Sequence, residues 1–164
     1  MPPRARTAPY APPMNRILSR SVVVAAPPSA VFDLLADPSR HPDFDGSGTV
    51  KGRLRGPRRL SLGARFGMRM RVGVPYPITN TVVEFEPERR IAWRHFGRHV
   101  WRYELEPVPE GTRVTESFDW STALSARGLE LAGIPKLNGQ SIDKTLPRLK
   151  SVVETAQQGG STAS

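Results

Sequence analysis

The chain has 164 residues, of which 38% are hydrophobic and 24% are charged, and this balance fits one globular domain and argues against a disordered chain. It contains no cysteine, which excludes disulfide scaffolds, cysteine-ligated zinc and thiol nucleophiles and suits a cytoplasmic protein. The formal net charge is +9, so nucleic acids, anionic membranes and acidic proteins have to be considered as partners.

Both ends of the sequence are expected to lie outside the fold. Residues 1–16 are basic and rich in proline but lack the apolar stretch of a secretory signal, so they predict a disordered tail, with Met14 as an alternative start. Residues 159–164, with the sequence GGSTAS, predict a second disordered tail. The domain is therefore expected to span residues 17–158, and no apolar run in it is long enough to cross a membrane.

A strand and a short helix are the first predicted elements. Residues 19–26 are rich in β-branched side chains and predict a strand, which ends at Pro27 and Pro28. After Ser29, apolar residues recur at helical spacing until Pro38, which predicts a helix. The segment SRHPDFDGSG that follows has the composition of a turn, with room for one short helical turn.

From residue 49 onward the hydrophobic pattern changes to a period of two. This alternation is typical of strands with one buried face and one solvent-facing side. The predicted strands lie at residues 49–56, 64–73, 78–87, around 91–95, around 101–105, and 112–120. Short turns join them, and Pro75 and Pro77 are expected to separate the second from the third. With the first strand they predict a seven-stranded antiparallel sheet.

The C-terminal part is predicted to be helical. Residues 121–138 are ambiguous, with room for a short helix in LSARGLELAG. Residues 140–158 place apolar side chains along one side of a long helix, which could cover the apolar face of the sheet. Pro147 lies inside this helix and is expected to kink it or to make its first turns irregular.

The chain resembles the polyketide cyclase/dehydrase branch of the START-like (SRPBCC) superfamily in three stretches, VVVAAPPSAVFDLLADPSRHPDFDG, VVEFEPERRIAWRH and WRYELEPVPEGTRVTESFDW. The resemblance covers residues 17–157. It implies the α+β helix-grip fold, in which a curved seven-stranded antiparallel sheet wraps around a long C-terminal helix. It also implies a cavity between sheet and helix for lipids, polyketides or other apolar molecules. Because this branch shares no catalytic residue set, the resemblance assigns none here.

The inward phase of the strands predicts cavity walls independently of that resemblance. Methionine and aromatic side chains adapt well to an irregular guest molecule, although they can equally well be ordinary core residues. The predicted ligand-cavity residues are Phe66, Met68, Met70, Val83, Phe85, Trp93, Trp101, Tyr103, Glu116, Phe118, Leu146 and Leu149.

Polar groups in the inward phase are the candidates for catalysis or ligand orientation. Glu116 lies between the apolar Val114 and Phe118, so its side chain is expected to point inward and its pKa to rise. His95 and Tyr103 also share the inward phase, and the three groups could converge as catalytic residues. The alternatives are an arginine salt bridge or an outward-turning bulge at Glu116, and a solvated strand end at His95.

No cofactor or metal site is expected. The sequence GSGTVKG at residues 46–52 is rich in glycine, but it precedes a strand instead of a helix and does not fit a dinucleotide-binding loop. His95 and His99 flank a turn without a third zinc ligand at a suitable spacing.

Basic residues gather between residues 47 and 83, where the sequence contains no acidic residue. Those in the phase opposite the apolar side chains are Lys51, Arg53, Arg55, Arg65, Arg69 and Arg71. They predict a convex basic face that is simply solvated or that docks on anionic lipid, an acidic protein or nucleic acid, with Arg53, Arg69 and Arg71 as membrane contacts. Few aromatic residues interleave with them, which makes nucleic acid an improbable partner.

Three functions are compatible with these patterns. Binding of a small hydrophobic molecule is favoured because it requires only the visible hydrophobic pattern. A cyclase or dehydratase that uses Glu116, His95 and Tyr103 is the second. An interaction protein that uses the basic face, with a vestigial cavity, is the third.

Overall fold

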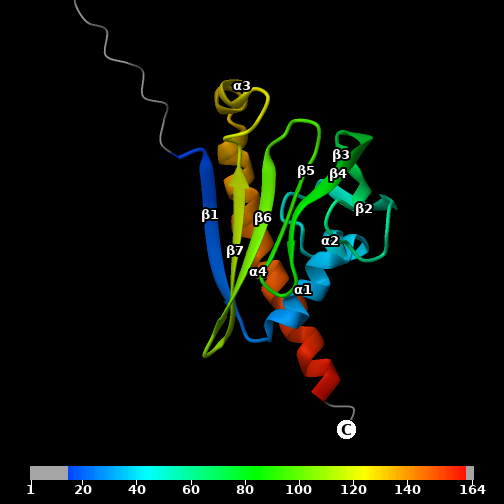
Figure 1. Cartoon of the computed structure of the whole chain (residues 1–164), viewed down its shortest axis with the longest axis vertical. Coiled ribbons are helices and arrows are strands. Elements are labelled where there is room, and N and C mark those ends of the chain that lie inside the picture. Colours follow the sequence, from blue (N-terminus) through cyan, green and yellow to red (C-terminus); the bar gives the residue numbers. More distant parts are fainter. Residues whose placement is uncertain (1–14, 162–164) are drawn as a thin grey trace, which may run out of the picture.

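Seven strands form one antiparallel sheet, and the computed structural model, which describes residues 15–161, places a long helix along the inner face of this sheet (Figure 1). The strands are β1 (Ile17–Val24), β2 (Val50–Arg55), β3 (Arg65–Val72), β4 (Val74–Glu86), β5 (Arg90–Arg94), β6 (Val100–Val108) and β7 (Gly111–Asp119). The helices are α1 (Pro28–Ala36), the 3₁₀ turn η1 (Pro38–Arg40), α2 (His41–Phe44), α3 (Ala126–Leu131) and α4 (Ile134–Ser161). The predicted α+β class and seven-stranded sheet are confirmed.

The strand order is β1-β7-β6-β5-β4-β3-β2, with antiparallel pairing throughout. The six strands β2 to β7 therefore form a meander, as their short connections predict, and β1 closes the far edge by pairing with β7. The segment with α1, η1 and α2 leads from one edge strand, β1, to the other, β2. It therefore has to cross the molecule, and it does so on the inner side of the sheet, where Phe32 contacts Phe85.

Strand β4 begins earlier than predicted, because Pro75 and Pro77 lie within it. They pair with Arg71 and Arg69 of β3. Strand β5 pairs only with residues 81–86 of β4, so the proline-containing part has a partner on one side alone. Proline, which has no backbone N–H group to donate, is tolerated at such an open edge.

Bulges correct two predicted side-chain directions. The pairing between β4 and β5 shifts between Val82 and Glu84, so Val82 is opposite Trp93 on the inner face and is 1% exposed. The predicted cavity residue Val83 is therefore displaced from the inward phase. In β2, shifts on both sides of residues 52–53 place Arg53 opposite the buried Met68, off the basic face to which it was assigned.

The C-terminal helix α4 is longer than predicted. It begins at Ile134 and continues to Ser161, past the predicted end at residue 158, and it runs through Pro147 without interruption. Short helix α3 lies within the ambiguous segment, as expected. Arg16, predicted to be in the tail, donates a hydrogen bond from Nε to Glu130 at 2.9 Å. The rest of the predicted tails, residues 1–14 and 162–164, lies outside the described residues.

The buried face of α4 closes the core against the sheet. Its residues Ile142, Leu146, Leu149 and Val153 are at most 4% exposed. Between residues 15 and 161 the structure contains no helix that is both long enough and apolar enough to span a bilayer.

Candidate functional site

Tyr103 and Glu116 form a polar pair inside the apolar core. They lie directly opposite each other on β6 and β7, so both side chains leave the same face of the sheet. The Tyr103 hydroxyl donates a hydrogen bond to Oε1 of Glu116 at 2.8 Å. The two residues are only 4% and 3% exposed, and the second carboxyl oxygen, Oε2, has no hydrogen-bond partner among the described residues.

Burial, together with the nearby carboxylate of Asp45, raises the pKa of Glu116 to about 8, against the lowering effect of the Tyr103 hydrogen bond. Burial and the neighbouring Glu116 also raise the pKa of Tyr103 well above its usual range. Glu116 is therefore mostly protonated at neutral pH. The predicted rise in its pKa is confirmed. The alternatives are wrong, since no arginine of residues 15–161 forms a salt bridge with Glu116 and the pairing of β7 with both neighbours is regular there.

An aromatic cluster occupies the inner face beside this pair. The ring of Trp93 stacks on His41 at a centroid distance of 5.0 Å and an interplanar angle of 20°. It also contacts Phe66 at 5.8 Å and Tyr103 at 5.7 Å. Phe44 in turn meets Tyr103 edge-on at 6.5 Å. These contacts are typical of a packed core. The interior around Trp93 is thus closed in this structure.

Most of the predicted ligand-cavity residues are buried, and the others are partly buried. Those that are buried are Phe66, Met68, Trp93, Tyr103, Glu116, Phe118, Leu146 and Leu149. Those that are partly buried against the core are Met70, Phe85 and Trp101. Apart from Val83, they therefore share one interior, and a guest molecule would have to displace side chains that now touch each other.

Sequence reasoning missed the contribution of α2. His41 is 6% exposed, its Nε2 lies 2.9 Å from the carbonyl oxygen of Leu35, and burial lowers its pKa. The loop after α2 is bound to α4, because the Gly46 N–H donates to Oγ1 of Thr145 at 2.9 Å. A Cβ atom at Gly46 would lie 2.4 Å from a backbone nitrogen of α4, so only glycine allows this approach. The composition of this segment predicted a turn with room for one short helical turn, as α2 is, but it did not predict these contacts with the core and with α4.

His95 does not join the Tyr103–Glu116 pair, so the predicted convergence is found for two of the three groups. Its ring lies against His99, with centroids 4.1 Å apart, at the turn between β5 and β6. Burial lowers the pKa of both histidines, that of His99 to about 4, so both are neutral at physiological pH. Across the described part of the chain, no three His, Asp or Glu side chains gather as a metal site would require.

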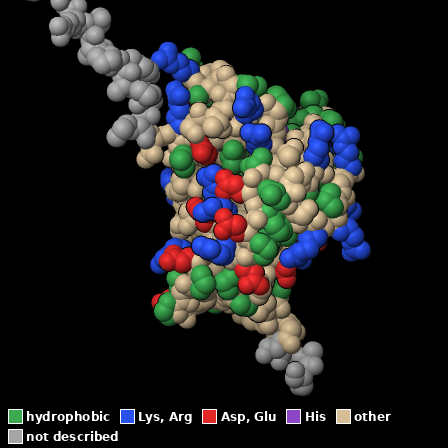
Figure 2. All heavy atoms as spheres, in the orientation of Figure 1, with side chains coloured by type: hydrophobic (Ala, Val, Ile, Leu, Met, Phe, Trp, Pro, Cys, Tyr) green, Lys and Arg blue, Asp and Glu red, His purple; other side chains and the backbone are tan. Residues whose placement is uncertain are grey.

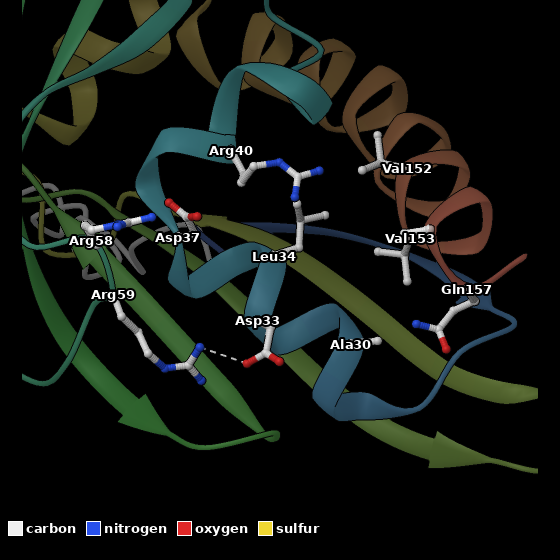
Figure 3. A pocket seen from close by; sticks show the side chains of 11 residues that line it. Ala30, Asp33, Leu34, Asp37, Arg40, Arg58, Arg59, Val152, Val153 and Gln157 are labelled. Carbon is white, nitrogen blue, oxygen red and sulfur yellow. Dashed lines mark ion pairs between the residues drawn. The ribbon is translucent and has the colours of Figure 1, made fainter. Parts of the chain in front are cut away.

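A surface pocket lies between α1, the loop that joins β2 to β3, and the C-terminal part of α4 (Figure 3). Its volume is about 440 Å³, and it is lined by Ala30, Asp33, Leu34, Asp37, Arg40, Arg58, Arg59, Val152, Val153, Ala156 and Gln157. Arg59 and Asp33 close one side with an ion pair of 2.8 Å. Two further surface pockets involve Arg55 and Thr79, and Glu86 and Thr115. None of the three includes a predicted ligand-cavity residue.

The outer face of the sheet contains two kinds of arginine. Over β4 to β7, Arg90, Arg102 and Arg113 are paired with carboxylates, as in Arg102 with Glu84 and Arg113 with Glu106. Over β2 and β3, Arg69 and Arg71 have no carboxylate partner within the described residues. Figure 2 shows both arrangements, with blue and red side chains alternating near the centre and blue side chains alone at the upper right.

Comparison with known proteins agrees with this architecture. Residues 16–154 match the family described as "Polyketide cyclase / dehydrase and lipid transport". The "Uncharacterized protein Rv0088" of Mycobacterium tuberculosis (strain ATCC 25618 / H37Rv) is 43% identical over 138 residues, which are 80% of this chain and 62% of that protein. The chain therefore spans less than two thirds of the length of this relative.

Two solved structures share the fold. Protein NE0264 from Nitrosomonas europaea has a TM-score of 0.65 and 19% identity, covering 87% of this chain and 96% of its own. The Polyketide_cyc-like protein Cgl2372 from Corynebacterium glutamicum has a TM-score of 0.56 and 22% identity, covering 88% and 94%. At such identities the likeness concerns the fold alone. Because the family match extends over most of the sequence, the chain belongs to the polyketide cyclase/dehydrase and lipid transport family of the START-like (SRPBCC) superfamily.

Proposed function

We propose that the protein binds a small, mainly apolar molecule of lipid or polyketide type between the sheet and α4, with Glu116 and Tyr103 as its polar anchor. The observation that supports this most strongly is the buried Oε2 of Glu116, which has no partner among the described residues. Leaving a buried polar atom without a partner costs about 1–3 kcal/mol. A hydroxyl or carbonyl group on a guest would remove this cost, because a protonated carboxyl group both donates and accepts hydrogen bonds.

The surroundings of the pair suit an apolar guest. Met68 and Trp93 on the sheet and Leu146 on α4 are buried in the same core. A guest that covers about 200 Å² of apolar surface would gain about 5 kcal/mol before the costs of binding. Apolar burial does not distinguish one apolar molecule from another, so the polar anchor would provide the selectivity.

The guest gains access when the closed interior rearranges. Helix α2 is a single turn, and its rings of His41 and Phe44 lie against Trp93 and Tyr103. Movement of this turn would uncover the Tyr103–Glu116 pair without breaking the sheet. A guest would then replace the ring contacts that α2 makes in the closed state.

A pair of probes that differ by one hydroxyl group tests the anchor. Binding of 2-naphthol and of naphthalene would be followed by amide chemical shifts in NMR spectra. The wild type should prefer 2-naphthol by about five- to tenfold, since one hydrogen bond contributes about 1 kcal/mol. Glu116→Leu should abolish the preference, whereas Glu110→Leu, at an exposed turn, should keep it. Equal affinity for both probes, or shifts confined to the pocket of Figure 3, would contradict the proposal.

A second candidate function is acid–base catalysis on a polyketide-like substrate. It is favoured by the pKa of about 8 at Glu116, because a catalytic acid works best when its pKa is near the working pH. In a dehydration, Glu116 would give its proton to the hydroxyl group, which leaves as water, and the resulting carboxylate would take the proton from the adjacent carbon, so that a double bond forms and Glu116 is protonated again. Glu116→Gln should then abolish the loss of water, followed by mass spectrometry, while binding persists. Unchanged turnover would exclude this role.

A further inference from the structure

Exposed apolar side chains gather at one end of the molecule. This end is formed by the β3–β4 hairpin, the β5–β6 loop, α3 and the start of α4, which all lie at the top of Figure 1. Its exposed apolar side chains are Val72, Val74, Tyr76, Phe96, Leu124, Leu131 and Leu137. Most of the large exposed apolar side chains among the described residues thus belong to this end, which we call the apolar end.

Two of these side chains project almost fully into solvent. Phe96 in the β5–β6 loop is 83% exposed, and Leu131 at the end of α3 is 90% exposed. Helix α3 has no buried residue. The loop before it is held to the β5–β6 loop, since the Leu124 N–H donates to the carbonyl oxygen of Gly97 at 3.1 Å. Exposed apolar side chains that gather in this way indicate an interaction surface, because soluble domains rarely expose large apolar patches outside their binding sites.

The charges around the apolar end are positive. Arg71, Arg98 and Lys136 are exposed there, and no carboxylate of the described residues forms a salt bridge with them. The carboxylate of α3, Glu130, is already bonded, because it accepts from Arg16 and from Nε1 of Trp120. The exposed cations at this end are therefore available to bind anions.

The opposite end of the sheet differs, because its charges are mixed. The turns β4–β5 and β6–β7 lie at the bottom of Figure 1, and Glu86 and Glu106 beside them are paired with Arg90 and Arg113. In Figure 2, red and blue side chains lie close together in the middle and lower parts of the view. The exposed cations of the apolar end, which form no salt bridge with a described carboxylate, would therefore favour the approach of this end to a negative surface.

We propose that the apolar end docks on an anionic phospholipid membrane. Phe96 and Leu131 would enter the boundary between headgroups and acyl chains, and the exposed arginines would bind lipid phosphates. A membrane fits better than a protein groove, because the apolar side chains project from four separate segments with cations among them. This surface goes beyond the ligand site, and the proposal holds whether or not a guest binds at Glu116.

Co-sedimentation with vesicles tests the apolar part of the surface. The full chain should pellet with phosphatidylcholine vesicles that contain phosphatidylglycerol, and much less with phosphatidylcholine alone. Phe96→Ser combined with Leu131→Ser should weaken the partition by about tenfold or more. The matched control is Leu54→Ser combined with Leu62→Ser, which removes leucines that are 47% and 66% exposed elsewhere and should leave binding unchanged.

Charge reversal tests the basic part in the same assay. Arg98→Glu should lower the partition about thirtyfold, since it changes the charge by two units and each charge near the surface contributes about 1 kcal/mol, whereas Arg58→Glu, away from this end, should change it much less. The proposal is overturned if the wild type does not pellet with anionic vesicles, if neutral vesicles bind it equally, or if each control loses as much as its partner variant. Unchanged thermal melting of all four variants would show that these losses do not come from unfolding.

Discussion

The two faces of the sheet shift the pKa of a glutamate side chain in opposite directions. On the inner face, Glu116 is buried with Tyr103 as its one hydrogen-bond donor, and burial raises its pKa to about 8. On the outer face, Glu84 accepts two hydrogen bonds from Nε of Arg102, at 3.2 and 3.0 Å, and one from its terminal NH2. This guanidinium group lowers the pKa of Glu84.

The difference separates an outer face whose carboxylates stabilise the sheet from an inner face on which we propose binding. The outer carboxylates are paired with arginines and join neighbouring strands, as in Arg90 with Glu104 on β6. The inner carboxyl group has one unpartnered oxygen inside the core, which lowers stability. Perturbed groups of this kind concentrate at functional sites, and this is why we place the polar anchor on the inner face.

Glu116→Gln should have the largest effect on the pH dependence of stability. The pKa of Glu116 is about 8 in the folded state and ordinarily 4.5, so its contribution is complete below pH 4.5 and is lost as the pH rises through 8. The full loss is about 5 kcal/mol at most. Urea unfolding of the wild type should show this loss between about pH 5 and about pH 9, and Glu116→Gln should remove it. Parallel pH profiles for the two proteins would contradict the account.

Trp93→Ala should be nearly as damaging, because Trp93 lies at the centre of the inner cluster and contacts three other rings. We expect a loss of about 3–5 kcal/mol in the free energy of unfolding. Trp101→Ala, at a partly buried tryptophan on the neighbouring strand, is the matched control and should cost less. Equal losses would mean that the interior is not packed around Trp93.

Tyr103→Phe separates the two members of the polar pair. It removes the hydrogen bond that holds the pKa of Glu116 down, so this pKa should rise above 8. The variant should lose about 1–2 kcal/mol of stability near neutral pH, because a second oxygen of Glu116 is left without a donor. The midpoint of the pH-dependent loss of stability measures the shift. A lower midpoint would show that Tyr103 is not the donor.

Glu84→Gln should have the smallest effect and the opposite pH dependence. The pKa of Glu84 is lowered in the folded state, so its contribution is present above pH 4.5 and disappears as the pH falls. We expect a loss of about 1 kcal/mol at neutral pH, since the pair with Arg102 is only partly buried. The difference from the wild type should vanish in acid. A difference that grows in acid would count against the ion pair.

The meander and the long helix could be predicted from the sequence because they depend on local patterns. The alternation of Phe66, Met68 and Met70 identifies both a strand and its buried side, and the position of Glu116 between apolar neighbours predicts its inward direction and raised pKa. The family resemblance then supplied the way in which the helix covers the sheet.

What the sequence did not reveal depends on contacts between distant segments. The strand through Pro75 and Pro77 is allowed because β5 ends before it, and Val83 is displaced by a bulge against the same strand. Neither fact is visible in the spacing of residues. His41 stacks on Trp93 because α2 lies against the inner face of the sheet, which the sequence does not reveal. This contact helps to close the interior, so the expected cavity is filled by packed side chains in this structure.

The most direct test of the contrast between the two faces is an NMR titration of the side-chain carboxyl carbons in protein labelled with ¹³C at glutamate. Spectra of Glu116→Gln and Glu84→Gln would assign the two signals. The account predicts that Glu116 titrates with a midpoint near 8 and that Glu84 titrates below its ordinary value of 4.5. A midpoint near 4.5 for Glu116 would show an ordinary solvated carboxylate and would contradict the proposed anchor.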